Sequence, residues 1–159
     1  MAESIPVQPV ATVRTPRTDL SDDYWGAVVS TLEFDPDVVG ADALAGLDTF
    51  SHVEVLFVFD QVDPAMVTTG ARHPRGNTEW PLVGIFGQRG KNRPNRIGLS
   101  RCRISAVEGL SLTVIGLDAV EGTPVLDVKP WMDEFAPIGP THQPAWSSQL
   151  MTNYYDAGS

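Results

Sequence analysis

The chain has a single cysteine, Cys102, among its 159 residues, which excludes an internal disulfide and a cysteine-rich zinc site. The three histidines lie far apart with no carboxylate at ligand spacing, so we expect no resident metal. No G-x-G triplet occurs, which excludes the Rossmann fingerprint, and the P-loop pattern fails because the sequence at residues 90–92 is GKN. The common nucleotide and metal motifs are therefore missing.

Long apolar runs are also missing. None approaches the roughly 20 residues that a membrane-spanning helix needs. The first residues, MAESIPVQPV, contain neither a basic n-region nor an apolar h-region, so we expect a cytoplasmic protein that binds no membrane. A chain of this length, 42% hydrophobic, suffices for one core and is short for two, which predicts a single domain over residues 1–159.

Positive charge is scarce outside one segment. Residues 72–103 hold eight of the eleven cationic side chains against a single acid, Glu79, which gives that segment a formal charge of +7. The rest of the chain carries −16, for a total of −9. Because clustered charge focuses the electrostatic potential, this segment is the expected place for an anion to dock.

Short β-rich runs separated by Gly, Pro and Asp predict a mainly β fold. Residues 50–59 are apolar on both faces in their second half, which is typical of a central strand. Glu108-Gly109 predicts a tight hairpin, because Gly109 adopts positive φ easily. The expected strands are residues 7–13, 26–34, 50–59, 97–107, 110–117 and 124–131.

Few helices are expected. Residues 144–155 predict one, because Trp146, Leu150 and Tyr154 recur every four residues, and we expect it to close one end of a barrel. Residues 36–47 predict a helical turn or two. The polar stretch at residues 63–80 fits either a binding loop or a solvated connection.

Two clusters carry coherent chemistry. In the first, Pro94 favours an extended Arg93 and Asn95 tolerates the left-handed region, so a rigid turn presents guanidinium groups suited to a carboxylate or phosphate. In the second, residues 116–129, acids surround a Gly-Thr-Pro turn and could accept hydrogen bonds from ribose hydroxyls, an adenine amino group or an ammonium. Each cluster also fits ordinary turn chemistry.

Several motifs occur in a fixed order: FSHVEVLFVF (50–59), HPRGN (73–77), GIFGQR (84–89), RPNRIGLS (93–100) and GLDAVEGTPVLDVKPW (116–131). In this order the chain resembles the TrmO family, also called TsaA-like or VirR-like, over about residues 7–135. The combination of RPN-x-IG with LD-x-x-x-GTPVLD-x-KP is specific to that family.

The resemblance implies a single non-Rossmann β-barrel with short peripheral helices that binds S-adenosylmethionine and forms a homodimer with its site near the subunit interface. Family enzymes methylate N6 of N6-threonylcarbamoyladenosine in the anticodon loop of tRNA. By position, the residues matching family cofactor contacts are Phe59, Asp60, Arg89, Leu99, Ile115, Gly116, Leu117 and Asp118, with Gly26 matched only by a loose alignment.

Roles follow from the same resemblance. Arg89 is expected to orient the methionyl carboxylate or a substrate anion, and Asp118 to meet the adenosyl part. The remaining pocket and acceptor candidates are Arg93, Asn95, Arg96, Asp127 and Lys129. Methyl transfer from a sulfonium needs alignment and exclusion of water more than a covalent nucleophile, and the sequence identifies no general base.

The chain departs from the family pattern beside the expected site. Residues 22–25 read DDYW in place of P-R-Q, Asp60 replaces a common His, and QRGKNRPNRIG replaces T-R-S-x-x-R-P-N-P-I-G. These changes leave the acceptor open. The alternatives are tRNA, a small-molecule metabolite or natural product methylated on nitrogen, and a non-catalytic S-adenosylmethionine-binding module.

Overall fold

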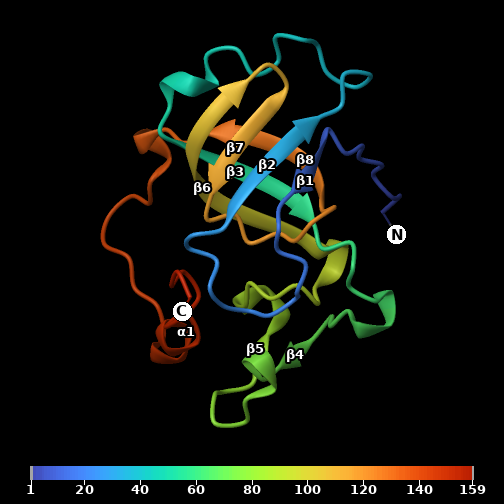
Figure 1. Cartoon of the computed structure of the whole chain (residues 1–159). Coiled ribbons are helices and arrows are strands. Elements are labelled where there is room, and N and C mark those ends of the chain that lie inside the picture. The colour runs from blue at the N-terminus through green and yellow to red at the C-terminus, as the bar shows by residue number, and fades with distance from the viewer. Residues whose placement is uncertain (1, 159) are drawn as a thin grey trace.

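Within residues 2–158, the part of the chain that this computed structural model describes, six strands close into a barrel (Figure 1). The order around the barrel is β1-β2-β7-β6-β3-β8, and β8 pairs back with β1. Every pairing in the barrel is antiparallel. The barrel strands are β1 (Ala11–Arg14), β2 (Val29–Phe34), β3 (His52–Val58), β6 (Ile97–Glu108), β7 (Ser111–Ile115) and β8 (Pro124–Pro130).

Alternation of side chains along each strand separates the core from the outer surface. On β3, Val53, Val55 and Phe57 point inward and are almost fully buried. On the first half of β6, Leu99 and Arg101 lie outward, while the alternate residues Gly98, Ser100 and Cys102 are buried. Strand β3 lies between β6 and β8, so the prediction of a central strand is confirmed. The mainly β, non-Rossmann barrel is confirmed with it.

The hairpin between β6 and β7 forms where the sequence predicted it. Glu108 pairs with Ser111, and Gly109 has φ of +60°. A residue with a Cβ would be strained there, whereas glycine adopts this conformation readily. The pair β6–β7 also contains a register shift between Ile104 and Ala106.

The long polar stretch folds into a small unit of its own below the barrel (Figure 1). Strand β4 (Ala71–Arg72) pairs with β5 (Val83–Gly84). Arg75 contacts Asp23 of the N-terminal loop at 2.9 Å, which ties the unit to that loop. The 3-10 helices of the chain are η1 (Leu47–Thr49), η2 (Pro64–Met66), η3 (Pro74–Gly76), η4 (Ile85–Gly87), η5 (Pro94–Arg96) and η6 (Asp133–Phe135).

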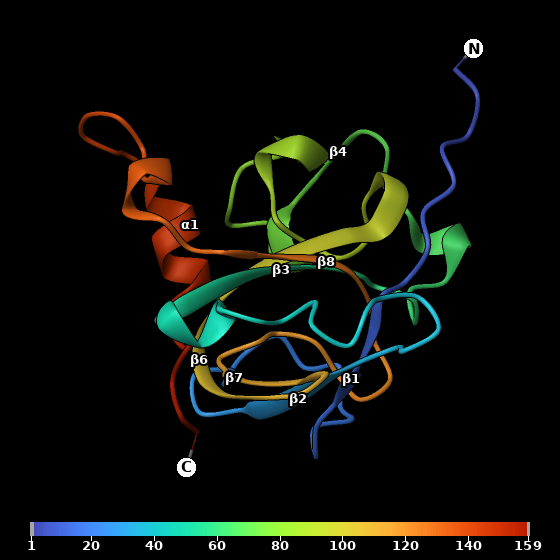
Figure 2. The ribbon, with the colours of Figure 1, turned by 90° about the horizontal axis from the view of Figure 1, so that it is seen from above.

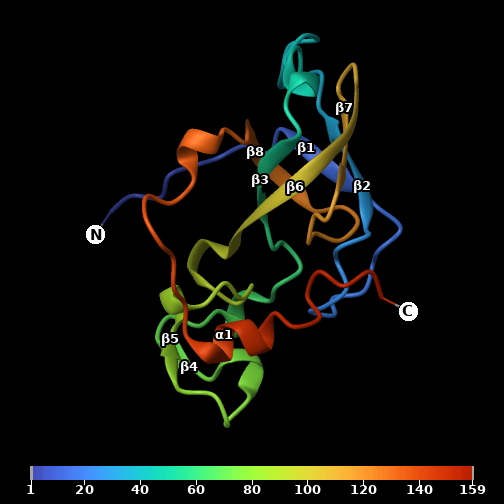
Figure 3. The same ribbon diagram turned by 90° about the vertical axis from the view of Figure 1, so that its left-hand side faces the viewer.

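The C-terminal helix is shorter than the predicted span of residues 144–155. Helix α1 covers Ala145–Leu150, and turns follow at residues 151–155. No residue of α1 is buried, so little tertiary packing is available to extend it. Figures 1 and 3 place α1 beside β4 and β5, and Trp80 Nε1 donates to Gln149 Oε1 at 2.9 Å across this contact. Figure 2 shows α1 and the N-terminal residues on opposite sides of the molecule.

The predicted helical turns at residues 36–47 are present as turns, followed by η1. A helix long and apolar enough to cross a bilayer does not occur among the described residues 2–158.

Gly98 provides a test of the barrel packing. A Cβ built on Gly98 would lie 2.5 Å from the ring of Phe57, whose side chain is 1% exposed. Gly98→Ala should therefore lower the free energy of unfolding by about 1–3 kcal/mol through overpacking, measured by urea denaturation. The matched control is Gly84→Ala, which has nothing within 4 Å of its Cβ and a φ of −57°. Equal stability of the two variants would contradict the packing.

Candidate functional site

The basic turn has the backbone that its sequence predicted. Arg93 is extended at φ −126°, while Asn95 has φ of +62° and lies in the left-handed region. Arg96 also has positive φ, at +52°. Two successive left-handed residues turn the chain sharply into β6, so the position of this turn is set by its own residues.

Several cationic side chains of this segment hold its loops together by hydrogen bonds to carbonyl oxygens. Arg93 Nη1 donates to Gln88 O at 2.7 Å, and Arg96 Nη1 donates to Val62 O at 2.9 Å. A carbonyl oxygen orients a guanidinium without cancelling its charge. Arg93 and Arg96, two of the predicted substrate or pocket candidates, thus build the loop and keep it positive.

Among the described residues, only two of the segment's eight cations contact a carboxylate within 4 Å. These are Arg75, which contacts Asp23, and Arg101, whose Nη2 lies 3.1 Å from Glu54. Arg101 also stacks over Trp131, 4.2 Å from the ring centroid. The other six keep uncompensated charge, which preserves an anion-attracting face.

Arg89 joins the basic loop to the outer face of β6. Its Nη2 donates to Leu99 O at 3.0 Å, and the Leu99 side chain is 40% exposed. The structure thus brings together two of the predicted cofactor contacts. One donor of the guanidinium is used by this bond, and a guanidinium has five in total.

The anionic turn follows β7. Gly116 has φ of +92°, and its N–H donates to Val28 O at 3.0 Å, which ties this turn to the start of β2. Leu117 is fully buried in the core, so this side chain anchors the turn. Ile115 ends β7, paired with Val29 and Arg103. Asp118, the residue after Leu117, is thereby held at the end of the barrel.

Asp118 has one partnered and one unpartnered oxygen within the described chain. Its Oδ2 accepts a hydrogen bond from the Tyr154 hydroxyl, and its Oδ1 is buried with no partner among the described residues. Burial raises the pKa of the Tyr154 phenol well above its usual range, and the Asp118 charge adds to this effect. The phenol therefore stays a donor. An orphaned carboxylate oxygen fits a ligand hydroxyl or amine.

The two turns flank the same short segment of chain. Burial raises the pKa of Tyr155, the Asp118 charge raises it further, and Arg89 and Arg101 act in the opposite direction. Tyr155 thus lies within electrostatic reach of both turns. On its backbone side it faces Gly26, where a Cβ would lie only 1.8 Å from Tyr155 O. Residues 154–155 therefore contact Asp118 through the Tyr154 hydroxyl and Gly26 through the Tyr155 carbonyl.

Phe59 and Asp60 lie at the exit of β3. The Phe59 N–H donates to Arg96 O at 2.8 Å, and its ring packs edge-on against Phe57, with centroids 5.1 Å apart. Asp60 is exposed in a turn. The structure thus joins Phe59 to the basic turn through its backbone.

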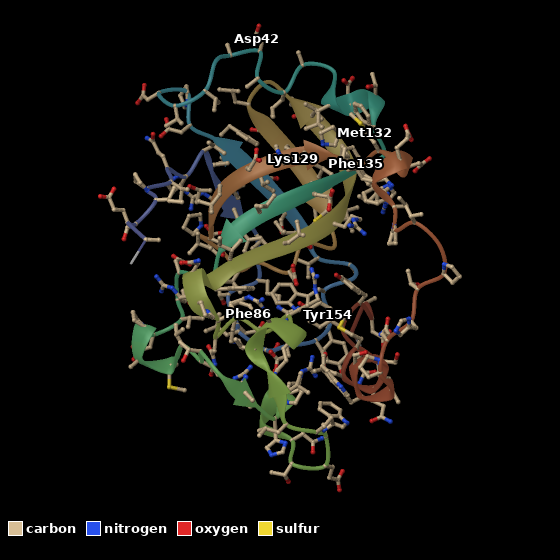
Figure 4. All side chains as sticks on the ribbon, turned by 180° about the vertical axis from the view of Figure 1, so that it is seen from behind. Asp42, Phe86, Lys129, Met132, Phe135 and Tyr154 are labelled. Atoms are coloured by element: carbon tan, nitrogen blue, oxygen red, sulfur yellow. The ribbon has the colours of Figure 1, made fainter. Side chains whose placement is uncertain are left out.

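Asp127 and Lys129 lie on β8 and form an ion pair at 3.0 Å. Leu56 of β3 pairs with Asp127 on one side and with Leu99 on the other, so Asp127 shares a cross-strand row with Leu99. Figure 4 shows Lys129 on the barrel, while Phe86 and Tyr154 lie below it, nearer the β4–β5 unit. The assignment of Asp127 and Lys129 as contacts to the acceptor stays a prediction.

The unusual N-terminal loop is internally bound. Arg17 lies 3.5 Å from the centroid of the Trp25 ring, and its Nη1 donates to Tyr24 O at 3.0 Å. Asp23 is neutralised by Arg75. Asp23, one of the residues that stand where the resemblance leads us to expect P-R-Q, therefore faces another loop of the same chain.

Sequence reasoning missed the tyrosines as members of the site. In the sequence, Tyr154 was identified only as one position on a predicted helix face, and no sequence pattern singled out Tyr155. Their role depends on contacts across 36 residues with Asp118 and well over 100 with the N-terminal loop, which no local pattern encodes.

No group of three metal-binding side chains gathers within residues 2–158. The lone thiol, Cys102, is 1% exposed, and burial raises its pKa to about 12. A buried, protonated thiol is a packing group and a poor nucleophile.

Comparisons with known proteins agree on one family. The family model described as the tRNA-methyltransferase O N-terminal domain matches residues 4–136. A human tRNA (adenine(37)-N6)-methyltransferase is 35% identical over 113 residues, covering 71% of this chain and 25% of that protein. A probable S-adenosyl-L-methionine-binding protein of Methanothermobacter thermautotrophicus is 33% identical over 140 residues, covering 85% of this chain and 96% of that protein.

A solved structure described as TrmO from Pseudomonas aeruginosa superposes with a TM-score of 0.73 at 27% identity. The match covers 92% of this chain and 63% of that one. The chain thus spans 25% of the human relative and nearly the whole of the archaeal one.

Proposed function

The chain belongs to the TrmO family, and on that premise we propose that it is an S-adenosylmethionine-dependent methyltransferase that modifies N6 of N6-threonylcarbamoyladenosine in the tRNA anticodon loop. The observation that carries it is the buried Asp118 Oδ1, which has no hydrogen-bond partner within residues 2–158, in a chain whose basic segment keeps Arg89 without a carboxylate partner in the same residues. The relatives' names point to the same cofactor and the same acceptor class.

The residues present fit the cofactor. Asp118 Oδ1 suits a ribose hydroxyl or an adenine amino group, and the free donors of Arg89 suit the methionyl carboxylate. The exposed Leu99 side chain suits the apolar part of the ligand. S-adenosylmethionine supplies an activated methyl group, so the protein's tasks are to bind, align and exclude water.

The positive segment supports an RNA acceptor. Its uncompensated guanidinium groups and Lys91 can contact phosphates, while the acidic remainder of the chain repels RNA and so restricts docking to this face. A small-molecule acceptor is the second candidate, because the exposed Asp60 replaces a family His beside the site and suits an amine. The archaeal relative's name states binding alone, which corresponds to a third candidate, a module without catalysis.

We also propose a homodimer, located in the cytoplasm where tRNA is modified. The outer face of β6 exposes Ile97 (42%) and Leu99 (40%), and Phe86 in the adjoining loop is 76% exposed. Apolar side chains gathered on one face favour association. Leu99 accepts the Arg89 bond through its carbonyl, so an interface on this face would lie next to the site.

Arg89 tests cofactor binding. Arg89→Ala should raise the dissociation constant for S-adenosylmethionine at least about 10-fold, because a charge-assisted hydrogen bond is lost, as measured by isothermal titration calorimetry. The control is Arg103→Ala, a nearby exposed cation outside the predicted set. Unchanged affinity of the Arg89 variant, with normal folding, would remove its assigned role.

The acceptor is tested by mass spectrometry of bulk tRNA from cells with and without the gene. We expect the N6-methylated form of threonylcarbamoyladenosine to disappear on deletion and to return on complementation. In solution, binding to an anticodon stem-loop should weaken steeply as salt rises. An unchanged nucleoside profile together with no RNA binding at low salt favours the small-molecule acceptor.

Light scattering coupled to size exclusion tests the dimer. The native chain should elute at twice its monomer mass of 17.2 kDa. Ile97→Glu should shift it to the monomer, because a charge would be buried in the interface. Ile138→Glu, at a fully exposed position beyond the barrel, is the control and should leave the mass unchanged. A native monomer would contradict the assembly.

A further inference from the structure

The segment after α1 lies across the N-terminal edge of the site. Tyr24 N–H donates to Asn153 O at 3.1 Å, and Trp25 N–H donates to Tyr154 O at 2.8 Å. The following carbonyl, Tyr155 O, lies so close to Gly26 that a Cβ there would sit 1.8 Å from it. The Tyr155 carbonyl therefore covers one side of the half-buried Gly26, and a ligand cannot approach Gly26 from that side while the segment stays there.

The same segment also occupies one oxygen of the Asp118 carboxylate, which we predict to contact the ligand. The Tyr154 hydroxyl donates to Asp118 Oδ2, the oxygen next to the orphaned Oδ1. A ribose or amino donor approaching this carboxylate would meet the tyrosine ring. Tyr155 lies beside it, with the rings edge-to-face and centroids 4.9 Å apart. Figure 4 shows Tyr154 below the barrel strands, where Asp118 holds it.

Open space lies elsewhere. A surface hollow of about 400 Å³ adjoins the N-terminal loop, and its lining includes Arg17, Tyr24 and Val28 but none of the predicted cofactor contacts. The C-terminal segment lies against two of the predicted contacts: the Tyr154 hydroxyl bonds to Asp118, and the Tyr155 carbonyl lies against Gly26.

The segment is attached weakly. Helix α1 buries none of its residues, and the Tyr155 side chain is 51% exposed. Beyond the backbone bonds and the tyrosine bond, one side-chain hydrogen bond within residues 2–158, from Trp80 to Gln149, links the segment to the rest of the chain. Elements with few buried contacts open at low free energy, well below global unfolding. The matched family region also ends at residue 136, before this segment begins.

We propose that residues 153–155 form an autoinhibitory plug that occupies the cofactor site and must leave it before S-adenosylmethionine binds. This inference rests on the proposed function. The Tyr154 hydroxyl acts as an internal competitor for Asp118, and the backbone at Tyr155 blocks Gly26. Because only the open fraction of molecules binds, the plug weakens the apparent affinity by the ratio of closed to open forms.

The test compares S-adenosylmethionine affinity, measured by calorimetry, among the native chain, a shortened chain and two single variants of the full chain. A chain ending at Thr152 should bind at least about 10-fold more tightly than the native chain. Tyr154→Phe keeps the ring and removes the bond to Asp118, and should bind about 3- to 10-fold more tightly. Tyr155→Phe removes a neighbouring hydroxyl that makes no hydrogen bond within residues 2–158. Its affinity for S-adenosylmethionine should stay within about twofold of the native value.

Hydrogen exchange gives a second, independent measure. Adding S-adenosylmethionine to the native chain should speed exchange at residues 151–156, whose turn bonds loosen when the plug leaves. The Tyr154→Phe variant still tests the plug if the shortened chain folds poorly.

The outcomes separate the two claims. Equal affinity in all four forms, or weaker binding by the shortened chain and by Tyr154→Phe, refutes the plug and leaves the methyltransferase assignment standing. Weaker binding would mean that the tyrosines form a wall of the cofactor site. Absence of S-adenosylmethionine binding in every form refutes the proposed function, and the plug with it.

Discussion

The Asp118 carboxylate is the constraint on which the site depends. A carboxylate placed at the end of a closed barrel loses water and needs donors in exchange. Here one oxygen has the Tyr154 hydroxyl and the other has none within the described chain. The barrel fixes the carboxylate through Leu117 and the left-handed Gly116, so the missing donor has to come to it. A ligand can supply this donor, whereas the C-terminal segment serves only the other oxygen through Tyr154.

Charge is organised around the same point. The segment of residues 72–103 keeps its charge because Arg89, Arg93 and Arg96 bond to carbonyl oxygens, while within the described chain carboxylates neutralise only Arg75 and Arg101. The loop can therefore be rigid and positive at once. A sulfonium cofactor with a carboxylate and a nucleoside presents both signs of charge, and the chain offers the Asp118 carboxylate and the Arg89 guanidinium as complementary partners.

A closed barrel with its site at one end explains why loop residues carry the chemistry. The strands supply a rigid frame, and the elements that reach the site are the turn after β7, the loop before β6, and the N- and C-terminal segments. Weakly packed segments are the ones that can open, which is the property a plug requires and a core strand lacks. The departures from the family pattern lie in these loops, where Asp23 pairs with Arg75.

The sequence by itself determined the barrel strands, the β6–β7 hairpin at Gly109, the central position of β3 and the left-handed Asn95. These features follow from alternation and from the conformational preferences of single residues, which act over a few positions. Only the tertiary structure decided that Tyr154 meets Asp118, that Tyr155 covers Gly26, and that Arg96 reaches back to Val62. Those contacts join residues separated by 34 positions or more, and chain folding brings them together without a local signal.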